Sequence, residues 1–153
     1  MYIAKKLKHL DLQANNLVTL PEDIGKFENL EELNLSSNQF TSSSSLVNPA
    51  LLFKAISQIP KLKRLNVARN KFTALHSDML NKEQDFLQLQ DLDFGYNLVE
   101  HEEGLTFTTQ IRHMNVLTIT GNPLGLAGPS QYKNLENVIV NVLAATLINE
   151  KIN

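Results

Sequence analysis

Cysteine and tryptophan are both absent from the sequence. Without thiols the chain can form neither a disulfide nor a thiolate metal site, and small secreted domains commonly depend on disulfides. We therefore expect a protein of a reducing compartment, with a cytoplasmic location. The four histidines do not replace the missing thiols, because none of them stands at zinc-ligand spacing. The sequence predicts no bound metal and no cofactor.

Strong charge of either sign and long apolar runs are also missing. The net charge is −2 over 153 residues, which gives no general attraction to nucleic acid or to an acidic membrane surface. No apolar run approaches the roughly 20 residues that cross a bilayer as a helix. The segment Met1 to Lys8 is too short and too charged for a signal peptide. We expect neither a nucleic-acid partner nor a membrane partner.

The chain does contain one spacing five times, Leu-x-x-Leu-x-Leu-x-x-Asn-x-Leu. The copies begin at Leu7, Leu30, Leu62, Leu89 and Met114. Alternating apolar residues predict a short strand with one buried face, and parallel strands need a crossover of about a dozen residues. This is the leucine-rich-repeat signature. It predicts an α/β fold, a leucine-rich-repeat solenoid (a horseshoe segment) of about five repeats, with a parallel concave sheet and a C-terminal helix.

One asparagine closes each copy of the motif where the chain leaves the strand. These residues are Asn15, Asn38, Asn70, Asn97 and Asn122. An amide side chain at such a turn can bond backbone groups that no strand or helix satisfies. We expect all five to be buried and stacked, and we call them the asparagine ladder.

The repeats divide the chain into two parts. We expect residues 1–128 to hold the repeats and residues 129–153 to form a C-terminal capping or interaction helix. An insertion at about 41–50 follows the second repeat and begins with a serine run. After it, Asn48 is a good N-cap and Pro49 suits a first helical turn, which predicts a helix from about Pro49 to Ile59.

The expected C-terminal helix, Ser130 to Lys151, is apolar on nearly every side. A one-sided cap would need only one such face. We therefore interpret its second face as a partner-binding surface, with the alternative that the whole helix packs against its own last repeat. The second face consists of Val140, Ala144, Leu147 and Ile148.

The non-leucine positions of each strand face away from the core, on the concave side of the sheet. This side is polar and mildly acidic, and Tyr96 is its aromatic residue. We predict that it binds a protein partner. The partner-binding residues expected there are His9, Asp11, Glu32, Asn34, Arg64, Asn66, Asp91, Asp93 and Tyr96.

No arrangement of residues suggests catalysis. The segment His101-Glu102-Glu103-Gly104-Leu105 begins like a zinc-protease motif, but Leu105 stands where the second histidine belongs. The Gly-rich stretch Gly121 to Gly128 lacks the lysine and hydroxyl of a phosphate loop. The sequence predicts a protein that is not an enzyme.

The five motifs make the chain resemble the cytosolic leucine-rich-repeat proteins over about residues 7–128. Its unequal repeat lengths and the return segment Leu51 to Pro60 resemble those of axoneme- and dynein-associated repeat proteins and of the X-ray radiation resistance-associated proteins. The resemblance implies a structural component of a large intracellular assembly, cytoskeletal or ciliary. The alternative is a soluble regulatory adaptor that binds one enzyme or signalling protein through its concave face.

Overall fold

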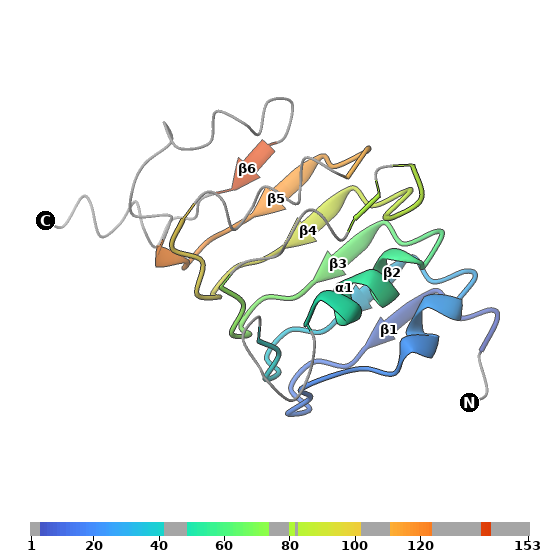
Figure 1. Cartoon of the computed structure of the whole chain (residues 1–153), viewed down its shortest axis with the longest axis horizontal. Helices are drawn as coiled ribbons and strands as arrows, with labels where there is room; N and C mark the ends of the chain where they lie inside the picture. The colour runs from blue at the N-terminus through green and yellow to red at the C-terminus, as the bar shows by residue number, and fades with distance from the viewer. Residues whose placement is uncertain are drawn as a thin grey trace, which may run out of the picture.

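The strands of the chain form a single parallel sheet in sequence order (Figure 1). The computed structural model describes residues 4–41, 49–73, 80–81, 83–101, 111–123 and 139–141. The strands are β1 His9–Asp11, β2 Glu32–Asn34, β3 Arg64–Asn66, β4 Asp91–Asp93, β5 Val116–Thr118 and β6 Ile139–Asn141. Each strand pairs with the next at equivalent motif positions, so the leucines of successive repeats lie side by side. The predicted leucine-rich-repeat solenoid is confirmed.

The return segments lie on the other side of the sheet and enclose the core. The first contains η1, a 3-10 helix at Glu22–Lys26, whose Ile24 is buried. The second contains α1, Pro49–Ser57, which packs directly on η1. A Cβ atom on Gly25 would lie 2.7 Å from the carbonyl oxygen of Ala55, so only glycine permits this approach.

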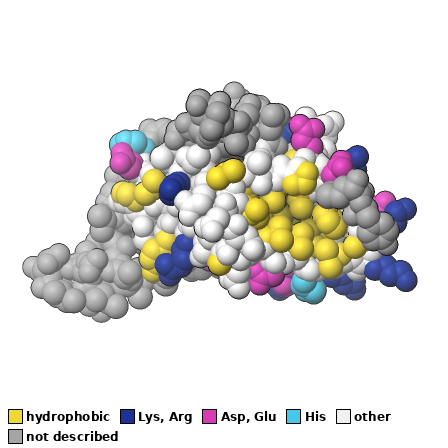
Figure 2. Space-filling model, turned by 90° about the horizontal axis from the view of Figure 1, so that it is seen from below, with side chains coloured by type: hydrophobic (Ala, Val, Ile, Leu, Met, Phe, Trp, Pro, Cys, Tyr) yellow, Lys and Arg dark blue, Asp and Glu magenta, His cyan; other side chains and the backbone are white. Residues whose placement is uncertain are grey.

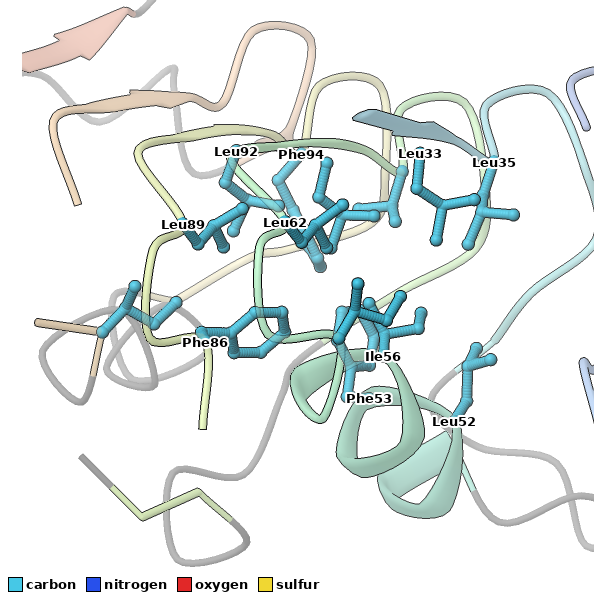
Figure 3. Close-up of a cluster of buried hydrophobic side chains, with 14 of the residues drawn as sticks. Leu33, Leu35, Leu52, Phe53, Ile56, Leu62, Phe86, Leu89, Leu92 and Phe94 are labelled. Atoms are coloured by element: carbon cyan, nitrogen blue, oxygen red, sulfur yellow. The ribbon is translucent and has the colours of Figure 1, made fainter. Parts of the chain in front are cut away.

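Helix α1 begins at the predicted residue and ends at Ser57, two residues early. Its last turn is tightened, because the N–H groups of Gln58 and Ile59 donate to carbonyls three residues back. Leu52, Ile56 and Ile59 are buried, as their helical spacing predicts. Figure 3 shows Leu52 and Ile56 on the side of α1 that faces the leucines of the sheet. The serine run lies outside the described residues.

Phenylalanine side chains fill the space between the helix and the sheet. The rings of Phe40 and Phe72 stack with their centroids 6.4 Å apart. Phe72 also meets Phe53 at 5.1 Å and Phe94 at 5.4 Å between centroids. Residues from the second, third and fourth repeats therefore share one aromatic cluster with α1, which fixes the inserted helix to the solenoid.

The asparagine ladder is confirmed at four of its five positions. Asn38, Asn70, Asn97 and Asn122 are buried. The Nδ2 group of Asn70 donates to the carbonyls of Leu35, Val67 and Ala68 at 3.0–3.1 Å, and its Oδ1 accepts from the N–H of Phe40. Asn15 makes the same bonds within its own turn but is exposed. The expected burial of Asn15 is wrong because no preceding turn covers the first repeat in the described structure.

The predicted C-terminal helix is wrong at residues 139–141, which form β6 beside β5. Val138, Ile139 and Val140 are β-branched, which favours a strand over a helix. Val140 pairs with Leu117 of β5. The interval from Leu117 to Val140 equals the interval from Leu10 to Leu33, which separates the first two repeats. Ile139 and Val140 therefore belong to the strand of a sixth repeat with an incomplete motif. Ala144, Leu147 and Ile148 lie outside the described residues.

Asp85 is buried in the return segment that follows the third repeat. Phe86 is buried, but Leu87 is exposed, and Asp85 is only 1% exposed. The Asp85 carboxylate accepts from Lys54 Nζ at 2.5 Å and from Gln58 Nε2 at 2.6 Å, both on or next to α1. This residue therefore joins the inserted helix to the fourth repeat.

Candidate functional site: the concave face

The concave face is built from the outer residues of five three-residue strands. In β2 to β5 the middle residue is buried and its two neighbours are more exposed. The first residues of the strands form the first column, which is His9, Glu32, Arg64, Asp91 and Val116. The last residues form the second column, which is Asp11, Asn34, Asn66, Asp93 and Thr118. The structure thus brings the predicted strand residues together on one face, and their role in binding stays a prediction.

Ion pairs run along the first column, because oppositely charged residues alternate in it. The Nδ1 atom of His9 lies 3.0 Å from Oε2 of Glu32. Arg64 bonds Glu32 on one side and places Nε 3.5 Å from Oδ2 of Asp91 on the other. The hydrogen bond from His9, with that from Arg64, holds the pKa of Glu32 below its usual value. All four side chains are at least a third exposed, so these pairs set side-chain positions more than stability.

The second column has a structural role that the sequence analysis missed. Oδ1 of Asp11, Asn34, Asn66 and Asp93 each accepts the backbone N–H two residues further on, at 2.9–3.0 Å. This is the Asx turn, in which a short side chain satisfies a backbone donor where the strand ends. The recurrence of Asp or Asn at this one motif position in four repeats could have predicted these turns. All four residues also line the concave face.

A third regular feature stands just before each residue of the asparagine ladder. The residues there have a left-handed backbone: Ala14, Ser37, Arg69, Tyr96 and Gly121, with φ between 51° and 71°. Tyr96 is 39% exposed at the edge of the concave face. The Arg69 guanidinium lies 4.2 Å from the centre of its ring. Tyr96 is therefore held between neighbouring repeats rather than free to reorient.

The two columns line a hollow of about 600 Å³. Four carboxylates, those of Asp11, Glu32, Asp91 and Asp93, share this lining with the single guanidinium of Arg64. The floor is therefore net negative, and its far end at Val116 is apolar. Such a surface favours an extended segment that carries positive charge and one apolar side chain.

No group of three or more His, Asp or Glu side chains in the described ranges could hold a metal ion. Within the same ranges, no helix is long and apolar enough to cross a membrane.

Comparison with known sequences identifies the repeats. A family model described as "Leucine Rich repeats (2 copies)" matches residues 5–48. An adenylate cyclase of Schizosaccharomyces pombe is 46% identical over 66 residues, which are 42% of this chain and 3% of that protein. Podocan of Mus musculus is 29% identical over 143 residues, covering 92% of this chain and 21% of that protein. The chain thus spans about a fifth or less of these relatives.

Solved structures share the fold over nearly the whole chain. A leucine-rich-repeat protein of Leptospira interrogans aligns with a TM-score of 0.65 and 26% identity, covering 90% of this chain and 31% of that one. A chain of the Drosophila melanogaster SNF/U2A' complex aligns with a TM-score of 0.67, covering 94% of this chain and 79% of that one. Its identity is 12%, so it demonstrates a common fold alone.

Proposed function

We propose that this leucine-rich-repeat protein is a non-enzymatic interaction module that holds a basic segment of a protein partner on its concave face. Leucine-rich-repeat proteins generally bind other proteins, and one solved neighbour was determined as a complex, SNF/U2A'. The observation that carries the proposal is the hollow with its excess of carboxylates. The ion pairs of Arg64 hold Glu32 and Asp91 in fixed positions, so a partner cation meets ordered acceptors.

The size of this surface limits what it can do alone. Five strands at about 4.8 Å spacing span roughly 20 Å, and the exposed residues of one strand span about 10 Å. A standard interface buries about 800 Å² on each partner. The concave face therefore supports a weak or transient contact, and a lasting partnership needs further surface elsewhere on the chain.

We propose a structural role in a large intracellular assembly, cytoplasmic and either cytoskeletal or ciliary, as the setting of this module. The resemblance of the repeat pattern supports this setting, and so does the partly exposed apolar surface of the first repeat. The second candidate is a regulatory adaptor for one enzyme or signalling protein, which the single small concave site favours. Fractionation of cell extract separates the two, because an assembly subunit sediments with large complexes and an adaptor does not.

A paired capture experiment tests the concave site. The wild-type chain and the Asp91→Lys variant are used as baits, and bound proteins are identified after cross-linking. Loss of a partner with Asp91→Lys supports the proposal. Glu28→Lys is the matched control, since this substitution makes the same change of charge at an exposed residue outside the sheet. Equal capture by all three baits would exclude the concave face as the binding site.

A further inference from the structure

The outer edge of β1 presents backbone groups that pair with no strand in the described part of the chain, since β1 is the first strand of the sheet. On its inner side, the N–H of Leu12 donates to the carbonyl of Asn34, and the carbonyl of Lys8 accepts from Glu32. Along a parallel strand, successive residues direct their backbone groups to opposite sides. The N–H and C=O groups of His9 and Asp11 therefore point outward.

Apolar side chains continue this edge into a hydrophobic surface. Five leucines of the first repeat are only partly buried: Leu7, Leu10, Leu12, Leu17 and Leu20. Val18 beside them is 54% exposed. Figure 2 shows hydrophobic side chains gathered in one broad area on this side of the molecule. An apolar area next to unpaired strand groups is a surface that pairs readily with another strand.

We propose that two copies of this chain associate through their β1 edges, antiparallel, about a two-fold axis at Leu10. In this register His9 of one copy lies opposite Asp11 of the other, and the reverse. Each such pair has both residues' backbone groups pointing outward, which is what a hydrogen-bonded antiparallel pair requires. Leu10 meets its own counterpart at the axis as a non-hydrogen-bonded pair, where side chains come closest.

The charges at this edge are complementary to themselves. The His9 side chain is 65% exposed and uses Nδ1 toward Glu32, which leaves Nε2 for a second acceptor. As an imidazolium it donates from both nitrogens. Within the described residues the Asp11 carboxylate accepts from Gln13 alone, so it has acceptor capacity for His9 of the second copy. Opposite charges directly across an antiparallel pair are stabilising, and like charges are destabilising.

Pairing at β1 leaves the concave face uncovered. The β1 strands of the two copies join the two sheets into one, and the first and second columns of both copies lie on the same face of this joined sheet. The dimer shares His9 and Asp11 with the lining of the hollow, while Asp91, Asp93 and Val116 at its other end lie away from the contact. The apolar surface of the first repeat is covered by the same surface of the second copy, as an isologous interface requires.

Charge reversal tests the register. Sedimentation equilibrium of the full chain should show a concentration-dependent dimer. His9→Asp should raise the dissociation constant of the dimer by about tenfold or more. In this variant the new aspartate of each copy faces Asp11 of the other copy, so the dimer contains two pairs of like charges. The double variant His9→Asp with Asp11→Lys should restore the dimer. His113→Asp, an exposed histidine far from β1, should leave it unchanged. A wild-type chain that is monomeric throughout would overturn the proposal.

A single introduced cysteine gives a second, direct test. The chain has no cysteine, so any disulfide must join introduced thiols. Leu10→Cys should cross-link two copies on mild oxidation, because facing residues at the axis lie within disulfide reach. Gln13→Cys is more exposed than Leu10→Cys but far from its counterpart in this register, so it should stay reduced. Cross-linking of neither variant, or of both equally, contradicts pairing about Leu10 even where a dimer exists.

Discussion

Lys54 and Asp85 are joined across two return segments, with Nζ of the lysine 2.5 Å from Oδ2 of the aspartate. The lysine comes from the inserted helix α1, and the aspartate from the segment before β4. The carboxylate also accepts the side chain of Gln58 and the backbone N–H of Asn81. Every oxygen of this buried group is thus bonded, so the insertion is fastened to the solenoid by polar contacts as well as by the phenylalanine cluster.

Replacing Asp85 tests this connection. Asp85→Asn should lower the free energy of unfolding by about 1–3 kcal/mol at neutral pH, because the new amide group faces donors. Urea unfolding measures the change. Lys63→Met is the control, because it breaks an exposed pair with Glu31 and should leave the urea midpoint where it is. An equal loss in both variants would mean that Asp85 is no more important than a surface carboxylate.

The same residue predicts a pH dependence. Burial acts to raise the pKa of Asp85, but the bonds from Lys54 and Asn81 outweigh it and hold the pKa below the ordinary value of 3.8. A carboxyl group with a lowered pKa in the folded state stabilises the fold above its unfolded pKa and loses that contribution as pH falls through the folded one. The stability difference between wild type and Asp85→Asn should therefore shrink as pH falls below about 4. A difference independent of pH would contradict this.

The asparagine ladder should contribute unequally along the chain. Asn70→Ala should cost about 1–3 kcal/mol, because three backbone carbonyls lose a buried donor and Phe40 loses its acceptor. Asn15→Ala should cost clearly less, since water can replace its bonds. Thermal or urea unfolding of the two variants makes the comparison. Equal costs would show that burial does not determine the contribution.

Gly121 and Tyr96 should be energetically coupled. A Cβ atom on Gly121 would come within 2.4 Å of Cδ1 in the Tyr96 ring, and φ at Gly121 is 71°. Gly121→Ala should therefore destabilise the fold by more than the roughly 1–2 kcal/mol of a left-handed alanine. In a Tyr96→Ala background the same change should cost less, because the ring is gone. Simple additivity in the double-mutant cycle would place the cost in the backbone alone.

Substitutions in the two columns of the concave face should differ in their effects on stability and on partner binding. Asp93→Ala should cost about 1 kcal/mol in stability, because the N–H of Gly95 loses its acceptor. Asp91→Ala should leave stability nearly unchanged and weaken capture of a basic partner. Urea unfolding and capture, measured on both variants, distinguish the columns. A loss of stability with Asp91→Ala would give the first column a structural role too.

The sequence predicts what depends on local period. The spacing Leu-x-x-Leu-x-Leu determines which strand residues are buried, so the sheet and the concave residues could be named in advance. Local capping by Asn48 and Pro49 likewise predicted where α1 begins. The helix predicted for the C-terminal segment was wrong at residues 139–141, because their apolar pattern fits the buried side of a helix when read alone, although Ile139 and Val140 are β-branched. Pairing with β5 decided between a helix and a strand.

Other features depend on residues that are distant in sequence. Asp85 reads as a surface carboxylate until Lys54 is brought beside it, and Tyr96 reads as free until Arg69 and Gly121 enclose it. Asn15 carries the same motif as Asn70, but it is exposed because burial of each turn comes from its neighbour. The sequence alone therefore determined the repeat, since the repeat is encoded within each motif. Only the tertiary structure decided which polar groups are buried, since the burial of each group depends on what lies in the adjacent turn.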